Sequence, residues 1–253
     1  MEGNNFLKLS EIVKRLRKEC PWDREQTHDS LKYLMIEECY EAVDSINKKD
    51  YNHLREELGD LLLHILLQAE ISEENKEFDL NSVIEMLSEK LIRRHPHIFN
   101  TEIFISKDEQ IKTWDKIKIE EGKLSVLSGL PKILPSLYLS QRIQEKVAKV
   151  GFDWENKSDV LKKIKEEIAE LENAISNNDE INIKEEIGDL IFSIVNLSRH
   201  YKINSEEALS ETNIKFTKRF NFIEKEMERN NKNIYESNLN ELDELWNKSK
   251  TNS

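Results

Sequence analysis

Two acidic segments, each present twice, constrain the fold of this chain more than any other feature of its sequence. Residues 37–41 read EECYE and recur as EEIAE at 166–170, and residues 56–61 read EELGDL and recur as EEIGDL at 185–190. Both recurrences are 129 positions apart, so the gap between the two segments is the same in both halves. The four tryptophans agree, because Trp22 and Trp154, like Trp114 and Trp246, are 132 positions apart. The chain is therefore predicted to contain the same structural unit twice.

Residues 122–136, which read GKLSVLSGLPKILPS, separate the two copies. This segment holds two of the four prolines and two of the six glycines of the chain, a composition typical of a linker. We therefore predict an N-terminal helical repeat over residues 1–121, a linker over 122–136 and a C-terminal helical repeat over 137–253.

Low glycine and proline content and a high share of charged residues predict an all-α fold. Only 6 glycines and 4 prolines occur in 253 residues, whereas 35% of the residues are charged, and this mixture favours amphipathic helices with broad solvated faces. In the first half, helices are expected at 6–19, 29–48, 51–75, 80–94 and 107–121. Asp79 or Asn81 is expected to cap the fourth helix, and Asn204 or Ser205 to cap its copy.

Charge, cysteine content and hydropathy argue against several classes of partner. A net charge of −12 opposes nonspecific binding of nucleic acid, whose phosphates would be repelled. Cys20 and Cys39 form no CxxC pair, which argues against a disulfide framework or a zinc site. The apolar run at 61–67 is interrupted by His64 and is too short to span a bilayer, and residues 1–10 lack the apolar core of a signal peptide. We expect a cytoplasmic protein that binds neither nucleic acid nor membranes.

The acidic segments have the spacing of a metal site shared by two helices. Residues three or four apart lie on one helical face, so Glu38 and Glu41 are neighbours, as are Glu57 and Asp60 on the next predicted helix. If the two helices pair antiparallel across a turn at 47–50, the carboxylates face one another and repel unless a cation neutralises them. Mg²⁺ takes oxygen ligands of this kind, and Mn²⁺ is expected to substitute for it. The predicted ligands are Glu38, Glu41, Glu57 and Asp60 in the first half, and Glu167, Glu170, Glu186 and Asp189 in the second.

A solvated helical face is the ordinary explanation of a single EExxE segment, and here three features favour a metal site instead. Both segments recur with unchanged spacing. Asp60 and Asp189 each begin an apolar run, where an unpaired carboxylate would be unfavourable. Gly59 and Gly188 lie within predicted helices despite a cost of about 1 kcal/mol relative to alanine, which indicates either tight helix packing or close approach of a ligand.

Each half also carries a cationic stripe downstream of its acidic segments. The stripe follows an i, i+3, i+4 pattern, and the planar guanidinium suits phosphate oxygens, although such stripes are commonly plain solvated surface. Trp114 and Trp246 are candidates for stacking on a nucleobase, with core packing as the alternative. Trp22 and Trp154 are interpreted as structural plugs near the site. The predicted phosphate contacts are Lys90, Arg93, Arg94, Lys215, Lys218 and Arg219.

Taken together, these motifs resemble the MazG family of nucleoside triphosphate pyrophosphohydrolases. The resemblance rests on EExxE followed by ExxD in both halves, CPWDREQTHDSL at 20–31, RRHPHIF at 93–99, SGLPKILPSL at 128–137 and GFDW at 151–154. It covers nearly the whole chain, in the two-repeat form of the family. It implies two tandem helical-bundle repeats, a homodimer, Mg²⁺ dependence, and hydrolysis of many NTPs and dNTPs to the monophosphate and diphosphate.

The resemblance further implies that the second repeat is the catalytic one, with Lys215, Lys218, Arg219 and Trp246 contacting the nucleotide. Lys218 stands where the family more usually has arginine. Glu166, or Glu37 in the first half, lies beside a predicted ligand and is a candidate general base for the attacking water, with a surface role as the alternative. Two other hypotheses are a non-catalytic nucleotide- or metal-sensing helical protein and a narrow-specificity dNTP or phosphoribosyl-ATP pyrophosphohydrolase. The duplicated layout argues against the latter, which is usually a single-repeat chain.

Overall fold

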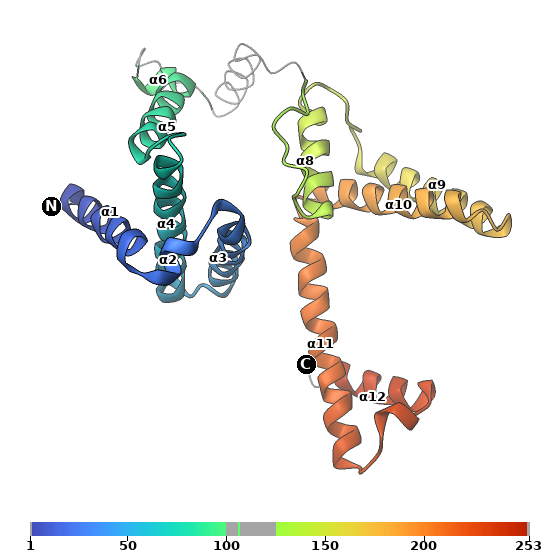
Figure 1. Cartoon of the computed structure of the whole chain (residues 1–253). Coiled ribbons are helices and arrows are strands. Elements are labelled where there is room, and N and C mark those ends of the chain that lie inside the picture. The colour runs from blue at the N-terminus through green and yellow to red at the C-terminus, as the bar shows by residue number, and fades with distance from the viewer. Residues whose placement is uncertain (1, 100–105, 107–124, 252–253) are drawn as a thin grey trace. The chain divides into compact units, whose positions relative to one another are not determined.

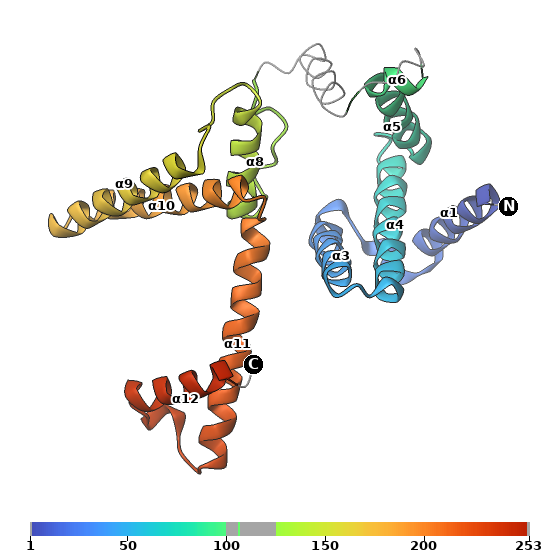
Figure 2. The same cartoon turned by 180° about the vertical axis from the view of Figure 1, so that it is seen from behind.

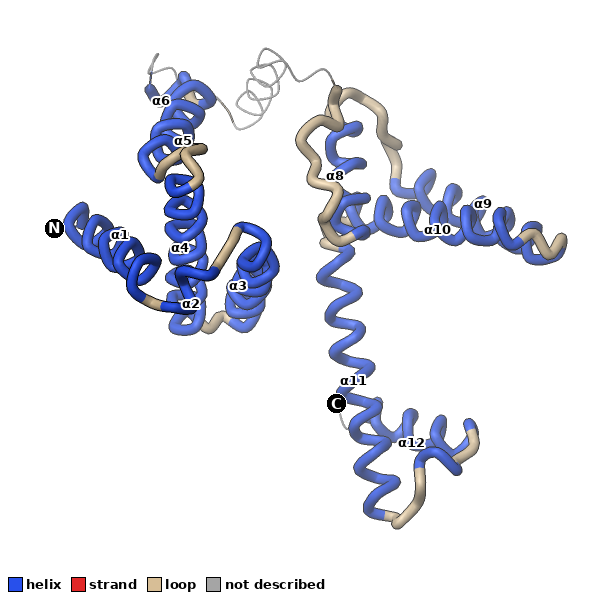
Figure 3. Tube along the Cα trace, viewed as in Figure 1, coloured by secondary structure: helices blue, strands red, loops and turns tan. Residues whose placement is uncertain are grey.

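The computed structural model describes residues 2–99, 106 and 125–251, and within these ranges every regular element is a helix (Figures 1 and 3). This observation confirms the all-α prediction. The chain divides into two compact units, Met1–Lys118 and Ile119–Ser253. The helix expected at 107–121, with Trp114, and the first residues of the expected linker lie outside the described residues. None of the described helices is long and apolar enough to cross a membrane.

The helices of the first unit begin where the sequence supplies capping side chains. Thr27 and Ser30 form a reciprocal capping box at the start of α3, which satisfies two backbone N–H groups that the helix leaves unpaired. Asp79, one of the two predicted caps, accepts a hydrogen bond from the backbone N–H of Ser82 at 2.8 Å and begins α5. The elements are α1 (Glu2–Glu19), α2 (Pro21–Glu25), α3 (His28–Lys48), α4 (Tyr51–Glu74), α5 (Leu80–Arg94) and α6 (Pro96–Phe99).

A two-residue turn folds α3 and α4 into a hairpin, as the sequence predicts. Lys49 adopts the left-handed conformation with φ 58°, and Asp50 caps α4 by accepting hydrogen bonds from the backbone N–H groups of Asn52 and His53. The second unit repeats this turn between α9 and α10, where Asn178 has φ 53° and Asp179 caps α10. The same local chemistry therefore sets the register of both hairpins.

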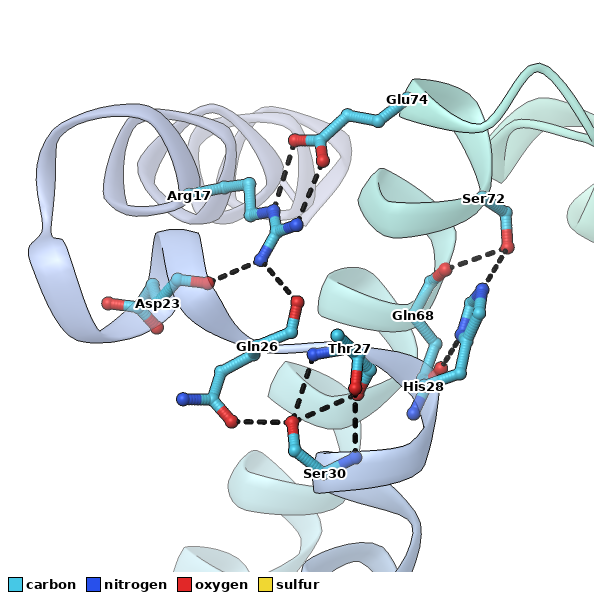
Figure 4. A network of polar contacts seen from close by, with 9 residues as sticks. All are labelled: Arg17, Asp23, Gln26, Thr27, His28, Ser30, Gln68, Ser72 and Glu74. Atoms are coloured by element: carbon cyan, nitrogen blue, oxygen red, sulfur yellow. Dashed lines mark hydrogen bonds and ion pairs between the residues drawn. The ribbon is translucent and has the colours of Figure 1, made fainter.

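A buried arginine joins α1, α2 and α4 in the first unit (Figure 4). The guanidinium of Arg17 binds the Glu74 carboxylate through Nε and Nη2 at 3.0 and 2.8 Å, and donates to the backbone carbonyls of Asp23 and Gln26. Beside it, α1, α3 and α4 contribute to one apolar cluster, which consists of Val13, Leu31, Leu66, Leu67 and Ile71. The hairpin is thus fixed to α1 by both apolar packing and a charged network.

The second unit carries an equivalent hairpin, formed by α9 and α10. Helix α8 packs on α10, where the side chain of Gln144 donates a hydrogen bond to the backbone carbonyl of Phe192 at 2.9 Å. Asn204, one of the two caps predicted for the copy, accepts from two backbone N–H groups and begins α11. The elements are α8 (Ser136–Ala148), α9 (Lys157–Ser176), α10 (Glu180–His200), α11 (Ser205–Arg229), a 3-10 turn (Ile234–Glu236) and α12 (Leu239–Thr251).

Helix α11 leads away from the α9–α10 hairpin, and α12 packs against its later part (Figures 1 and 2). Ile223 and Met227 of α11 and Leu245 of α12 form the apolar contact between these two helices. In the segment before α9, the Asp153 carboxylate binds Arg199 and His200 at the end of α10. Burial acts to raise the pKa of Asp153, but these two partners hold it below its usual value.

Candidate metal centres

The first hairpin brings three of its predicted metal ligands together. Glu38 and Glu41 of α3 and Glu57 of α4 each place a carboxylate oxygen within 4.8 Å of the others. The antiparallel pairing of the two helices produces this arrangement, because each acidic segment presents one helical face to the other. Glu57 is only 3% exposed, whereas Glu41 is open to solvent. The cluster therefore has one buried end and one accessible end.

Burial and neighbouring charge make two of these carboxyl groups, Glu41 and Glu57, weaker acids than usual. Burial and the neighbouring Glu38 raise the pKa of Glu57, and the charge of Glu57 raises the pKa of Glu41. Their negative charges repel one another unless a proton or a cation is bound. A hard divalent cation, which accepts several carboxylate oxygens, fits this donor set.

Two histidines border the first cluster. His53 bridges the helices, since its Nδ1 is 2.8 Å from the Ser45 hydroxyl and its Nε2 is 2.8 Å from Oε1 of Glu57. His64 is buried on α4, one turn after Asp60, and its Nε2 is 4.0 Å from Oε1 of Glu38. Desolvation by burial lowers the pKa of His64, so the imidazole is neutral near pH 7.

The second hairpin gathers a related but different set of acids. Carboxylate oxygens of Glu167 on α9 and of Glu186 and Asp189 on α10 lie within 4.8 Å of one another. Burial raises the pKa of Glu186, and the charges of Glu170, Glu167 and Asp189 raise it further. Glu167 is buried, with 4% of its surface exposed, while Asp189 is exposed. As in the first hairpin, acids from both helices converge on one small volume.

In each half, one of the four predicted ligands lies outside the close cluster. In the first half this residue is Asp60, whose charge acts on His64. In the second half it is Glu170, whose charge acts on Glu186, so its carboxylate lies near the cluster without belonging to it. The four-ligand pattern of the sequence thus becomes a set of three in each hairpin, and the omitted acid differs.

Lys163 is a member of the second cluster that sequence reasoning missed. Its ammonium lies 2.6 Å from Oε1 of Glu166 and 2.8 Å from Oε1 of Glu167, and the hydrogen bonds to both carboxylates raise the pKa of the lysine. The signal was available, because Lys163 precedes Glu166 by three residues and Glu167 by four. The corresponding position of the first half, Leu34, has no charge. Glu166, the candidate base, is therefore held in an ion pair.

The two mid-helix glycines lie in open space on the side where a side chain would stand, among the residues that the structure describes. A Cβ atom placed on Gly59 or on Gly188 would have no neighbour within 4 Å among the atoms that the structure describes. Tight packing of helices among the described residues therefore does not explain why glycine stands at these two positions. Close approach of a ligand or of another chain remains as their explanation.

Neither cationic stripe meets the acidic cluster of its own unit. Lys90, Arg93 and Arg94 lie in the last turns of α5, beyond the end of α4 that is opposite to the α3–α4 turn (Figure 1). Lys215, Lys218 and Arg219 lie in the middle of α11, whose described contacts are with α8, α10 and α12. The side chains of Lys215 and Lys218 are exposed to solvent.

Three of the four tryptophans lie within the described residues. Trp246 packs on α11, with its ring centroid 5.0 Å from that of Phe216 and 5.6 Å from the guanidinium carbon of Arg219. It is half-buried in the α11–α12 contact, and its stacking on a nucleobase stays a prediction. Trp22 and Trp154 are 56% and 44% exposed, so their interpretation as structural plugs is wrong.

A repeated helical hairpin, with acids from two antiparallel helices converging in each copy, defines an all-α protein with two related acidic modules. A model of the MazG nucleotide pyrophosphohydrolase domain matches this chain twice, at residues 26–99 and 155–222, which are the two hairpins and their flanks. The chain belongs to the MazG family.

Similar proteins span nearly the same length as this chain. The nucleoside triphosphate pyrophosphohydrolase/pyrophosphatase MazG of Thermotoga maritima is 42% identical over 253 residues, which cover 98% of this chain and 96% of that protein. The nucleoside triphosphate pyrophosphohydrolase of Escherichia coli K12 is 37% identical over 252 residues and covers 96% of both. A crystal structure of a mazG-related protein from Thermotoga maritima is 33% identical, covers 44% of this chain and 97% of that chain, and aligns with a TM-score of 0.41.

Proposed function

We propose that this chain is a Mg²⁺-dependent pyrophosphohydrolase that converts NTPs and dNTPs, with broad base specificity, to monophosphates and diphosphate in the cytoplasm. The observation that carries the proposal is the second acidic cluster, in which Glu167, Glu186 and Asp189 converge and the pKa of Glu186 is raised. Such a cluster is stabilised by a divalent cation, which a nucleotide triphosphate also requires. The names of the two full-length relatives support the same activity.

Different residues of the chain would bind the cation and accept the proton. Glu167, Glu186 and Asp189 would hold the ion, with Glu170 near enough to join them. When bound, Mg²⁺ supplies neutralisation of phosphate charge and polarisation of the phosphoryl group, and Mn²⁺ is expected to serve in its place. Glu166 would accept the proton of the attacking water after Lys163 leaves its carboxylate, which frees the base only in the loaded site. Lys215, Lys218 and Arg219 would contact phosphate oxygens, and Trp246 the base.

A panel of NTPs and dNTPs, incubated with the full chain and Mg²⁺, tests the activity through its products. Nucleoside monophosphate plus pyrophosphate is expected from most of the panel, whereas nucleoside diphosphate plus inorganic phosphate would contradict the proposal. Binding of Mg²⁺–NTP without any product would indicate a sensor. Turnover of dCTP, dUTP or phosphoribosyl-ATP alone would indicate a narrow-specificity enzyme. The Asp189→Ala variant is the control for contaminating hydrolases.

We further propose that the active form is a homodimer, because the hairpin of the second unit leaves an apolar stripe uncovered. On α9, three large apolar residues recur at seven-residue intervals, and on α10 three more follow an i, i+4, i+7 pattern, so each set lies along one helical face. A solvated apolar stripe of this length is unfavourable and is typical of an interface. The exposed residues are Leu161, Ile168, Ile175, Ile187, Ile191 and Ile194, at 42–54% exposure.

The dimer would also complete the site, because the cationic stripe of α11 and the acidic cluster of the same unit do not meet. A second copy could bring its own α11 to the cluster. Mixing an acid-defective variant, Asp189→Ala, with a stripe-defective variant, Lys215→Ala, tests this arrangement. If the two parts come from different copies, the mixture recovers about a quarter of the wild-type activity, since half of the dimers are mixed and each has one intact site. No recovery after verified subunit exchange would place both parts in one chain.

A further inference from the structure

Two aromatic side chains of the second unit are exposed in the segment between α8 and α9. Phe152 is 79% exposed and Trp154 is 44% exposed. Together with Gly151 and Asp153, they line a shallow pocket of about 290 Å³. Ligand pockets are lined mainly by hydrophobic and aromatic side chains, and those for whole drug-sized molecules begin at about this volume. The space therefore suits one flat heteroaromatic ring.

The backbone turn at the end of α8 presents these rings to solvent. Gly151 has φ 85°, in the left-handed region, and two hydrogen bonds close the helix. The N–H of Gly151 donates to the carbonyl of Ala148 at 3.0 Å, and the N–H of Phe152 donates to the carbonyl of Val147 at 3.1 Å. At such a helix end, an apolar side chain after the glycine commonly packs back on the helix. The ring of Phe152 remains in solvent instead.

An ion-pair network fixes this turn to the end of α10. The Asp153 carboxylate binds Arg199, contacts Nε2 of His200 at 3.2 Å, and accepts a hydrogen bond from the backbone N–H of Trp154 at 2.9 Å. Arg199 is itself held by two hydrogen bonds to the side chain of Asn196. Asp153 is thus a positioning residue, because it holds the segment that carries Trp154 in one place relative to α10.

The pocket lies at the end of the helical face that carries the second acidic cluster. From Asp189, steps of four, three and four residues lead along α10 through positions 193 and 196 to His200, so the two residues share one face. On α9, Glu167 is ten residues (167 − 157) beyond Lys157, where the helix begins, which corresponds to about 15 Å. An extended nucleoside triphosphate is of similar length, and its base lies at the opposite end from the terminal phosphate.

The first half has neither this pair of rings nor its anchor. Trp22 is the counterpart of Trp154, but it lies within the helix α2, and a cysteine stands where Phe152 would be. Glutamate and isoleucine stand 129 residues before Arg199 and His200. The pocket therefore belongs to the second half, for which nucleotide hydrolysis is proposed.

We propose that the pocket at residues 151–154 binds the base of the nucleotide whose phosphates bind at the second acidic cluster, with the base stacked on Trp154. This inference rests on the proposed function, and it adds a second aromatic contact to the one expected from Trp246. Stacking on an aromatic side chain tolerates any base, because every base has a π face. Such a pocket is thus compatible with hydrolysis of many NTPs and dNTPs.

A ligand without a base separates this pocket from the phosphate site. The full chain is titrated by calorimetry in Mg²⁺ with a non-hydrolysable ATP analogue and with inorganic tripolyphosphate, which has three phosphoryl groups and no base. Every sample carries Glu38→Ala, which removes an acid of the first cluster. Trp154→Leu is expected to weaken binding of the analogue by about 10-fold, as loss of one stacked ring does, and binding of tripolyphosphate by less than about twofold.

Matched variants separate stacking from a structural effect. Trp154→Phe keeps a flat ring and is expected to recover most of the affinity. Tyr235→Leu removes another aromatic ring of the second unit, which is 95% exposed, and is expected to change the binding of neither ligand. Unchanged binding of the analogue in Trp154→Leu, or an equal loss for tripolyphosphate, would overturn the proposal. So would a parent chain that binds the analogue no more tightly than tripolyphosphate.

Products are measured on the same chains without Glu38→Ala, which distinguishes the two possible failures. Base-dependent binding without any monophosphate product would refute the proposed hydrolysis alone. Normal product formation, together with unchanged binding of the analogue in Trp154→Leu, would refute the base pocket alone.

Discussion

Replacing Arg17 with methionine is expected to destabilise the first unit and to leave the nucleotide hydrolysis that we propose for the second unit unchanged. Arg17 is 7% exposed and makes hydrogen bonds to the Glu74 carboxylate and to the backbone carbonyls of Asp23 and Gln26 (Figure 4). Methionine fills a similar volume, so the variant removes mainly the charge and its hydrogen bonds. The network joins α1 and α2 to the C-terminal end of α4, whereas the acidic cluster lies near the N-terminal end of that helix.

The expected loss follows from the burial of each partner. Hydrogen bonds to a charged group contribute about 1.5–3 kcal/mol each, but the Glu74 side chain is 51% exposed and regains water when Arg17 is absent. The two carbonyl groups lose a donor in a partly buried setting, which costs about 1 kcal/mol each. With about 1 kcal/mol more for the ion pair with the half-exposed Glu74, we expect a total loss of about 3 kcal/mol in the free energy of unfolding. For a unit of this size, the melting temperature falls by about 10 °C.

Hydrogen exchange measured by mass spectrometry can assign this loss to the first unit, because peptides from α1 and α4 report on it separately from those of α9 and α10. Arg15→Met is the control, since Arg15 pairs with Glu19 at 2.9 Å with both side chains more than half exposed. Such a pair contributes less than about 1 kcal/mol. A loss below about 1 kcal/mol for Arg17→Met, or equal losses for the two variants, would refute the reasoning.

Four further predictions concern the acidic clusters. Asp189→Ala is expected to reduce pyrophosphate release by about 100-fold while helix content, measured by circular dichroism, stays constant. Glu167→Ala is expected to reduce release at saturating Mg²⁺ and ATP far more than Glu38→Ala, and a larger loss for Glu38→Ala would place the activity in the first repeat. Lys163→Met removes a cation that competes for Glu167, so calorimetry should show Mg²⁺ binding strengthened by about fivefold; weaker binding would contradict this. Because the pKa of Glu186 is raised above its ordinary value of 4.5, the metal-free second unit should lose stability as pH rises through that raised pKa. Thermal melts should show this loss abolished by Glu186→Gln or by Mg²⁺.

Local features of the fold could be predicted from the sequence because they depend on residues close together in the chain. The spacing of hydrophobic and charged residues identified the hairpins. The short polar side chains of Asp79 and Asn204 identified two helix starts. The convergence of acids across each hairpin followed from helical periodicity and the short turn. These inferences needed only the 3.6-residue period and the capping preferences of the helix.

Features that depend on the angle between helices could not be predicted in this way. Whether the stripe at Lys215 and Lys218 reaches the acids depends on the direction in which α11 leaves α10, and the contact with α8 and α12 sets that direction. His64 was set aside because its counterpart is Ser193. Comparison of the two copies finds what they share, and it discards the residues by which they differ.

The left-handed residues Lys49 and Asn178 make the hairpin turns sensitive to length. Each turn positions its second helix relative to the first, and one inserted residue would rotate that helix by about 100° and shift it by about 1.5 Å. Glu57 would then leave the face that meets Glu38, and Glu186 the face that meets Glu167, although no acid had been replaced. Substitutions should therefore be tolerated on the solvated faces of the long helices and at 125–135, while insertions and deletions at 49–50 and 178–179 should be selected against as strongly as loss of the carboxylates themselves.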